Sequence, residues 1–284
     1  MFKLRLITAL ISMPVIIIAL CYLSMIAFAI AILAISMLAA WEWSVLAGLS
    51  SYPMKILLTT SCGVILLGCM LRILSDANIQ NGISFLNTTT FLWIALCWWV
   101  IAIPLVYYYP HSAIFWRRSC ILRILFGFLT IFSFFCGMLA IRKYHYAVDH
   151  NAGVWLLFYL LIVVWGADSG AYVFGKLFGK HQLAPNLSSG KTVEGLMGGF
   201  CTSFLFFVLL SGLSSVSIPC IRLLFYTIIV VFASLLGDLN ESMFKREADV
   251  KDSGNFFPGH GGVLDRIDSL TAAAPVFASL PWLM

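Results

Sequence analysis

Residues 242–268 of this chain read SMFKREADVKDSGNFFPGHGGVLDRID. The wider segment from Asp238 to Asp268 holds 11 of the 29 Asp, Glu, Lys and Arg residues in the 284-residue chain. Long apolar runs flank this charged segment on both sides, so we expect it at the edge of a membrane. Charges beside hydrocarbon are costly and usually mark a functional site. The segment therefore predicts both a membrane fold and the position of its chemistry.

The composition excludes an ordinary soluble domain. The chain is 62% hydrophobic and only 10% charged, whereas charged residues make up about 25% of a typical soluble domain. A helix needs about 20 apolar residues to cross a bilayer. We therefore expect an all-α polytopic membrane protein with about nine transmembrane helices; the alternative count is eight. The expected spans are 4–22, 24–41, 55–74, 91–109, 120–140, 153–171, 193–213, 219–237 and 269–284.

The N-terminus has two interpretations. Residues 1–22 resemble a secretory signal peptide, with Lys3 and Arg5 before an apolar core. A polar mature chain normally follows such a peptide, but here a second apolar run follows directly, so we expect a retained span.

The basic residues predict the orientation. With a cytoplasmic N-terminus and nine spans, 13 of the 17 Lys and Arg residues lie inside, as the positive-inside rule requires. The four outside are Arg72, Arg142, Lys143 and Arg222. Replacing Arg142 should therefore be nearly neutral. Anionic lipid headgroups account for the net charge of +5, so we expect no nucleic-acid partner. The short loops suggest a bacterial inner (plasma) membrane, with an organellar membrane as the alternative.

The two halves of the chain differ in character. Residues 1–150 have short connections and few polar groups, and we interpret them as transmembrane scaffold, including Glu42 between two tryptophans. Residues 151–284 form the expected catalytic region of the same membrane domain. Small residues cluster at 166–171 and 195–199, where they would let helices approach closely. Asp168 lies in the first cluster and is a candidate functional carboxylate, the alternative being a helix cap.

Two carboxylates border the charged segment. Asp238 closes one apolar run and Asp265 opens the next, so the loop between them can bring the two together. Paired carboxylates suit a hard divalent ion such as Mg²⁺. If 238–249 is helical, Ser242, Lys245 and Asp249 share one face with Asp238. The alternative is a solvated amphipathic turn.

The rest of the segment supplies further candidates. Lys251 and Asp252 continue the charged pattern, and the glycine-rich stretch 258–262 could cradle an anion with its backbone N–H groups. His260 could bind phosphate, donate a proton or ligate a metal, or it could be an ordinary loop residue. Arg266 can contact phosphate oxygens bidentately, and Asp268 could orient it.

A second polar loop spans 175–195. Its Gly-Lys-Thr sequence at 190–192 is not a P-loop, because Pro185 stands where the earlier glycine is required and no strand is expected before it. Ser188, Lys191 and Thr192 nevertheless precede an expected helix, and anions bind at helix N-termini. The alternative is that topology alone explains the lysines.

Residues 242–268 resemble the signature of the phosphatidate cytidylyltransferases, or CDP-diacylglycerol synthases. The matching elements are Ser242, Lys245-Arg246, Lys251-Asp252, His260-Gly261-Gly262 and Asp265-Arg266-Ile267-Asp268. Two weaker matches are Asp168-Ser169 with Ala171-Tyr172, and Lys191-Thr192 with Glu194-Gly195. The family commonly has Ser-Pro before the Lys-Thr pair, whereas this chain has Ser188-Ser189, which puts the rigidity of that loop in doubt.

The resemblance implies that the chain joins CTP and phosphatidic acid, giving CDP-diacylglycerol and pyrophosphate. It further implies Asp238 and Asp265 as ligands of Mg²⁺, with a second cation such as K⁺ as an option. The implied phosphate-binding cations are Lys245, Arg246, Lys251 and Arg266, assisted by Ser242 and Asp252. The implied pocket residues are Asp168, Ser188, Lys191, Thr192, His260 and Asp268. A homodimer stays open. The alternatives are a CTP-dependent lipid or polyprenol kinase and an ion-coupled transporter.

Overall fold

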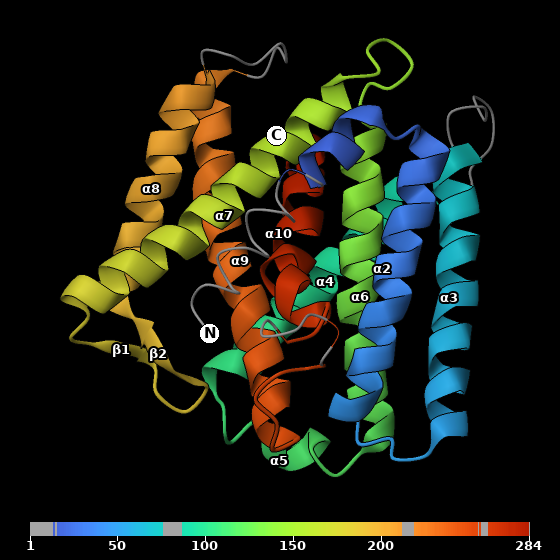
Figure 1. The fold of residues 1–284 in the computed structure, drawn as a ribbon, viewed down its shortest axis with the longest axis vertical. Coiled ribbons are helices and arrows are strands. Elements are labelled where there is room, and N and C mark those ends of the chain that lie inside the picture. Colours follow the sequence, from blue (N-terminus) through green and yellow to red (C-terminus); the bar gives the residue numbers. More distant parts are fainter. Residues whose placement is uncertain are drawn as a thin grey trace.

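A computed structural model describes Pro14 and residues 16–75, 87–211, 219–254, 256 and 261–283. Figure 1 shows a bundle of long helices with one small hairpin at its side. The elements are α2 (Met25–Leu46), α3 (Tyr52–Ser75), α4 (Thr88–Tyr107), α5 (Ala113–Trp116), α6 (Cys120–Lys143), α7 (Ala152–Phe178), β1 (Gln182–Ala184), β2 (Ser188–Thr192), α8 (Val193–Ser211), α9 (Cys220–Glu247) and α10 (Leu264–Leu283).

Seven of the described helices are long and apolar enough to cross a membrane: α2, α3, α4, α6, α7, α8 and α9. They coincide with the seven expected spans between 24 and 237, so the all-α polytopic membrane fold is confirmed. The expected span 4–22 lies largely outside the described residues. The expected span 269–284 corresponds to α10, which is not among the seven. The count of nine therefore stays a prediction.

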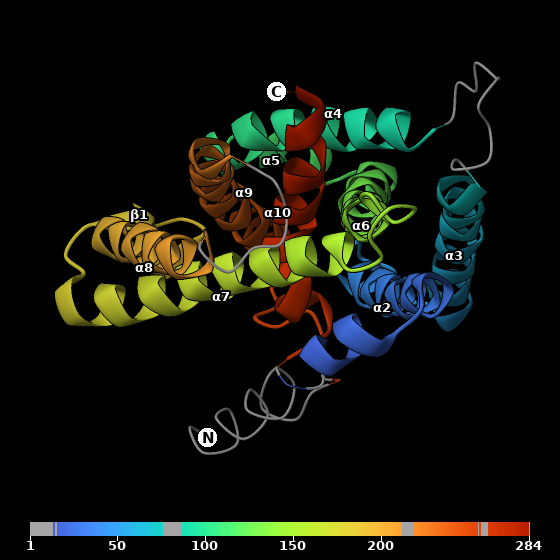
Figure 2. The ribbon, with the colours of Figure 1, turned by 90° about the horizontal axis from the view of Figure 1, so that it is seen from above.

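Helix α10 forms the centre of the bundle. Seen from above, it lies among α4, α6, α7 and α9 (Figure 2). Its small residues Ala272, Ala273 and Ala274 are fully buried. A Cβ on Gly137 of α6 would lie only 2.4 Å from the backbone nitrogen of Pro275, so the two helices touch through their backbones. Small residues allow this close approach.

Helices α7 and α8 pack against each other as a pair, and α7 runs obliquely across the bundle (Figure 1). Glycines make their contact. A Cβ on Gly198 would lie 2.3 Å from Cβ of Phe174, and one on Gly199 would lie 2.8 Å from the carbonyl oxygen of Ala167. The predicted packing role of the small-residue clusters is therefore confirmed.

Two local expectations were wrong. Residues 188–192 are a strand, β2, which pairs antiparallel with β1 in a hairpin instead of forming an irregular loop. Helix α9 ends at Glu247, and Asp249 adopts a left-handed backbone conformation with φ of 54°. Asp249 therefore does not continue the helix face of Asp238, because the chain turns away just after the helix end.

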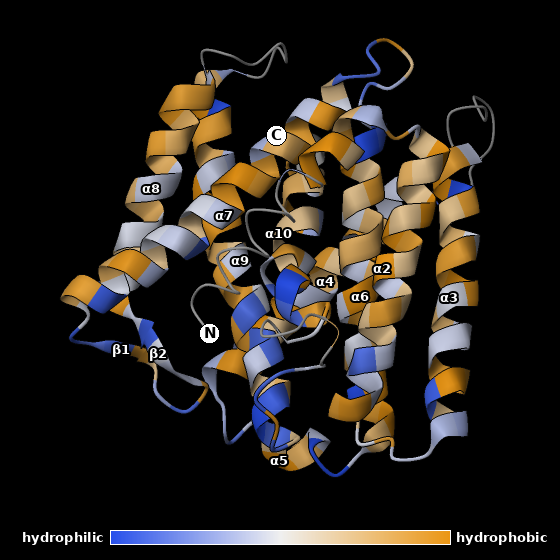
Figure 3. Ribbon diagram, viewed as in Figure 1, coloured by the Kyte–Doolittle hydropathy of each residue, from blue (hydrophilic) through white to orange (hydrophobic). Residues whose placement is uncertain are grey.

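Figure 3 shows how polarity is distributed over this fold. Hydrophilic residues gather in the hairpin, along the C-terminal part of α9 and at the start of α10, whereas the rest of the long helices is mostly hydrophobic. The polar parts of three elements that are distant in the sequence thus lie in one region of the molecule.

Candidate active site

The hairpin reaches α9 through an ion pair. Lys191 Nζ of β2 lies 2.5 Å from Asp238 Oδ2, and the two side chains are 22% and 28% exposed. One helical turn further along α9, the Ser242 hydroxyl donates to Asp238 Oδ1 over 3.4 Å. The expected proximity of Asp238 and Ser242 on one face of the helix is therefore confirmed. The structure adds Lys191, whose charge is directed at the Asp238 carboxylate.

Lys245 is held between two carboxylates. Its Nζ lies 3.2 Å from Glu241 Oε1, one turn earlier in α9, and 2.8 Å from Asp265 Oδ1 of α10. The three side chains are only 3–12% exposed. A buried charge is strongly destabilising without a partner, so this arrangement ties the start of α10 to α9.

Asp265 also forms hydrogen bonds with the loop that precedes α10. Its Oδ2 accepts hydrogen bonds from the backbone N–H of Ser253, at 2.9 Å, and of Gly262, at 2.8 Å. Burial acts to raise the pKa of Asp265, but the contacts with Lys245 and Gly262 outweigh it and leave the pKa below its ordinary value. Asp265 therefore stays ionised near neutral pH with three donors around it.

Two more carboxylates lie deeper in the bundle. The Ser269 hydroxyl of α10 donates to Asp168 of α7 at 3.3 Å, and Asp268 Oδ1 accepts from the Ser269 N–H at 2.7 Å. A Cβ on Gly237 would touch the carbonyl oxygen of Asp268, at 2.4 Å. Because Gly237 precedes the end of α9 by ten residues, Asp268 lies about 15 Å inside that end. The site is thus recessed, not confined to the helix ends.

These carboxylates form one electrostatic group with Asp238. Asp168, Asp238 and Asp268 are close enough for each to act on its neighbours. Asp168 is exposed although it lies in the middle of α7. Carboxylates that repel one another and remain accessible would be stabilised by a cation.

The remaining predicted cations are more accessible. Arg246, Lys251 and Arg266 are all exposed, as is Asp252. The Arg246 Nε donates to the carbonyl oxygen of Leu187 at 3.0 Å, which docks the hairpin turn onto α9.

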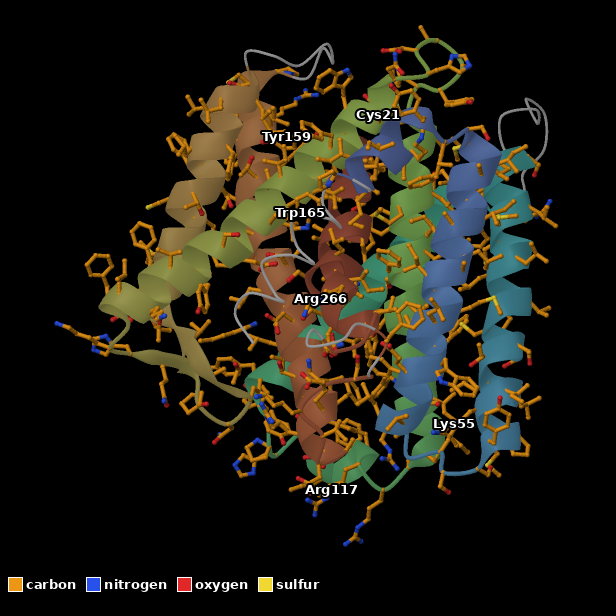
Figure 4. All side chains as sticks on the ribbon, in the orientation of Figure 1. Cys21, Lys55, Arg117, Tyr159, Trp165 and Arg266 are labelled. Carbon is orange, nitrogen blue, oxygen red and sulfur yellow. The ribbon has the colours of Figure 1, made fainter. Side chains whose placement is uncertain are left out.

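The depth of Arg266 can be followed in Figure 4, where it is labelled near the middle of the molecule. Lys55 and Arg117 lie at one end, and Cys21 and Tyr159 lie toward the other.

The second polar segment has partly structural roles. Ser188 is half-buried opposite Ala184 in the hairpin. The Thr192 oxygen accepts a hydrogen bond from the N–H of Gly195 at 3.0 Å and so caps α8. Glu194 accepts from the backbone N–H groups of Lys180 and His181. A negative side chain therefore already lies at the helix start where we expected an anion.

The two predicted metal ligands have different partners. Asp238 pairs with Lys191, and Asp265 with Lys245. In the part of the chain that the structure describes, no group of three or more His, Cys, Asp or Glu side chains has the arrangement of a metal site. His260 lies outside the described residues.

Sequence reasoning did not select three polar residues of this region as candidates: Glu42, Glu241 and Ser269. Glu42 accepts hydrogen bonds from the N–H groups of Val263 and Leu264, at 2.9 and 2.7 Å. The rule that singled out Asp168, a carboxylate within an apolar run, applies equally to Glu42. Glu241 could have been found from its spacing, four residues before Lys245.

Comparison with known proteins identifies the family of the chain. The model of the cytidylyltransferase family matches residues 3–284. The chain is 40% identical over 284 residues to the phosphatidate cytidylyltransferase of Haemophilus influenzae, with 98% of both chains covered. It is 38% identical over 283 residues to that of Pseudomonas aeruginosa, covering 99% of this chain and 97% of the relative. A shorter match, 41% over 153 residues, covers 52% of this chain and 55% of the Bacillus subtilis phosphatidate cytidylyltransferase. The chain belongs to the cytidylyltransferase family.

Proposed function

We propose that this protein is a phosphatidate cytidylyltransferase, which transfers CMP from CTP to phosphatidic acid and releases pyrophosphate. The observation that carries the proposal is the match to relatives of that name over almost the whole of both chains. The site geometry supports it, because several cations and carboxylates converge where a membrane lipid and a nucleotide could meet.

The reaction explains why such a site would be rich in charge. A phosphate oxygen of phosphatidic acid attacks the α-phosphorus of CTP, and the bond from that phosphorus to the oxygen bridging to the β-phosphorus breaks. The attacking phosphate monoester is already largely ionised near neutral pH, since its second pKa is about 6. A strong base is therefore not required. The main barrier is repulsion between two polyanions, which fixed positive charges lower.

The exposed cations suit this task. Arg246, Lys251 and Arg266 are accessible to incoming phosphates, and arginine can bind two phosphate oxygens at once. Lys191 and Lys245 pair with carboxylates in this structure, so phosphates would compete with those carboxylates for the lysine charge. Ser242 would add a hydroxyl donor, and Asp252 would keep Lys251 oriented.

The other predicted residues would shape the pocket. Asp168 and Asp268 interact electrostatically with Asp238 and would contribute negative charge to the pocket. Ser188 and Thr192 would support the hairpin that presents Lys191, and His260 completes the proposed set from outside the described residues.

We also propose that Mg²⁺ takes part, held by Asp238 with Asp265, and that a second cation such as K⁺ can bind nearby. The donor chemistry fits, because carboxylate oxygens suit hard cations. Asp238 is the better placed of the two, since its side chain is 28% exposed and it interacts electrostatically with two other carboxylates, Asp168 and Asp268. When bound, Mg²⁺ would supply positive charge that neutralises phosphate oxygens.

The protein is an integral membrane protein, and we propose that it lies in a bacterial inner membrane with its site facing the cytoplasm. The excess of basic residues on that side supports the orientation. Lys55 and Arg117, both expected inside, lie at the same end of the molecule (Figure 4). A lipid could then enter sideways from the bilayer while CTP arrives from water.

Label transfer tests the function directly. Purified protein with Mg²⁺ and phosphatidic acid receives CTP labelled at either the α- or the γ-phosphorus. We expect only the α-label to enter the lipid. Entry of the γ-label would instead identify a lipid kinase, and transfer of neither label by folded protein would favour a transporter.

A further inference from the structure

Glu42 connects the N-terminal half of the chain to the loop that precedes α10. It lies in α2, near the end of that helix, and is only 7% exposed. Its partners are 211 to 222 residues away in the sequence. A buried carboxylate is costly unless hydrogen bonds satisfy it, so these distant contacts need an explanation.

Both Glu42 oxygens are engaged by the loop. Oε1 accepts from the N–H of Val263 at 2.9 Å. Oε2 accepts from the N–H of Leu264 at 2.7 Å and from the hydroxyl of Ser253 at 3.2 Å. Glu42 thus caps the N-terminus of α10 and at the same time holds the earlier part of the loop.

Ser253 links this contact to the active-site carboxylate Asp265. Its hydroxyl donates to Glu42 and its backbone N–H donates to Asp265. Glu42 and Asp265 together receive hydrogen bonds from Ser253, Gly262, Val263 and Leu264. We call the described residues 251–254 and 261–264 the loop ends; the two carboxylates hold these ends against each other.

The fit between Glu42 and the loop ends is tight. A Cβ on Gly254 would lie 2.5 Å from Glu42 Oε1, and one on Gly262 would lie 2.3 Å from Oε2. Real Cβ atoms do not approach that closely, so glycine at both positions lets the backbone reach the carboxylate.

Glu42 itself is fixed by its neighbour. Trp43 is 1% exposed, its indole N–H donates to the carbonyl oxygen of Arg123 at 2.9 Å, and its ring packs on Phe244 of α9 with centroids 4.9 Å apart. The end of α2 is therefore locked to both α6 and α9. A side chain on such a rigid base can hold a loop precisely.

We propose that Glu42 is a positioning residue for CMP transfer: it fixes the loop ends so that Lys251, Asp252 and Asp265 meet the substrates. Lys251 and Asp252 directly precede Ser253, and Asp265 directly follows Leu264, so each is one or two residues from a contact that Glu42 makes. The proposal rests on the function proposed above. It assigns a role to a residue of the half that the sequence marks as scaffold.

The test compares Glu42→Gln with Ser253→Ala, their double mutant and a control. In the parent protein each of the two Glu42 oxygens accepts a hydrogen bond from a backbone N–H. In Glu42→Gln an amide NH₂ replaces one of these oxygens, so a donor group faces a backbone N–H and that hydrogen bond is lost. Ser253→Ala removes only the hydroxyl contact. The control Ser36→Ala, on the same helix, deletes a fully buried hydroxyl that has no hydrogen-bond partner among the described residues.

Two quantities are measured for each variant: steady-state CMP transfer, and hydrogen exchange of peptides covering the loop ends in protein without CTP. For Glu42→Gln we expect faster exchange at the loop ends with unchanged exchange in α9. We expect kcat to fall about tenfold or more, since a displacement of about 1 Å can cost about 100-fold. KM for phosphatidic acid should change less than kcat, because the lipid-facing helices are untouched.

Ser253→Ala should show a smaller loss, and the double mutant should be no worse than Glu42→Gln, because the lost contact is shared. Ser36→Ala should match the parent in both measurements. If Glu42→Gln does not fold, Ser253→Ala still tests the contact.

Unchanged exchange at the loop ends, or faster exchange with an unchanged kcat, would overturn the proposal. A parent protein that exchanges normally but transfers no CMP would refute the proposed function and the positioning role with it. The exchange comparison would still show whether Glu42 holds the loop.

Discussion

Lys245 shows at the scale of one residue how structure and chemistry are combined. Its charge lies between Glu241 and Asp265, and the second of these also holds two backbone N–H groups of the loop. A change at Asp265 therefore acts on a proposed phosphate-binding lysine and on the loop together.

We predict that Asp265→Asn abolishes CMP transfer, with kcat lower by about 100-fold or more, as when one charge-stabilising group is removed from other active sites. The asparagine oxygen can still accept a loop N–H, but the charge facing Lys245 is lost. Because Glu241 remains paired with Lys245, the protein should still insert and fold. Steady-state kinetics and a thermal unfolding curve measure the two effects separately.

Asp249→Asn provides the matched control. It makes the same chemical change in the same segment, at an exposed residue with φ of 54°, and asparagine tolerates that left-handed conformation as well as aspartate does. This variant should keep parental activity. Near-normal turnover by Asp265→Asn would remove Asp265 from the site.

The sequence predicted which residues gather at the site better than it predicted their partners. Charge density alone marked Asp238, Lys245 and Asp265. The pairings of Lys191 with Asp238 and of Lys245 with Asp265 depend on how a hairpin and two helices pack, and no spacing rule encodes that. Glu42 lies in the half of the chain that has few polar groups and short connections, and for that reason we interpreted it as transmembrane scaffold.

At the scale of the element, the α7–α8 contact depends on residues without side chains. The Cβ atom missing from Gly198 leaves room for Phe174. Since α7 carries Asp168, this contact also helps to set the position of one proposed site carboxylate.

We predict that Gly198→Ala destabilises the protein by roughly 1–3 kcal/mol, the usual cost of overpacking a tight contact. The added methyl would lie 2.3 Å from Cβ of Phe174, an atom that cannot move without its helix. Gly68→Ala in α3 is the control, because nothing lies within 4 Å of its new methyl. Thermal unfolding in detergent compares the two, and equal midpoints would mean that α7 and α8 do not pack as described.

Hydropathy predicted the apolar cores of the helices but not their polar ends. The expected span ended at 237, whereas α9 continues to Glu247. Those ten residues include Asp238, Glu241 and Lys245, and their polarity lowers the hydropathy of the segment below that of a membrane span. The segment is nevertheless helical, because packing against α10 stabilises it. The hairpin was missed for a related reason, since Ser188–Thr192 lacks the apolar alternation of a half-buried strand.

At the scale of the whole molecule, contacts between distant segments hold the bundle together. Glu42 joins α2 to the start of α10. Arg142, in the last turn of α6, donates to the carbonyl oxygens of His150 and Leu23, at 3.0 and 3.2 Å. Local patterns in the sequence cannot reveal either contact, because each depends on the order in which the helices are arranged.

Arg142 therefore corrects an expectation. We expected replacement of Arg142 to be nearly neutral because we placed the residue in an outside loop. In the structure Arg142 lies in the last turn of α6 and is only 4% exposed. Arg142→Ala would leave two carbonyl groups without their donor, and hydrogen bonds to charged groups contribute about 1.5–3 kcal/mol each. We predict a lower unfolding temperature but unchanged kcat and KM in the protein that remains folded, because the site lies elsewhere in the bundle.

Arg222→Ala is the comparison for this prediction, since Arg222 is exposed and was expected on the same side of the membrane. Its unfolding temperature should equal that of the parent. Equal temperatures for the two variants would show that the Arg142 contacts do not hold the bundle together. A kinetic defect in Arg142→Ala without a loss of stability would instead show that the Arg142 contacts influence the active site. That result would contradict the assignment of a purely structural role to Arg142.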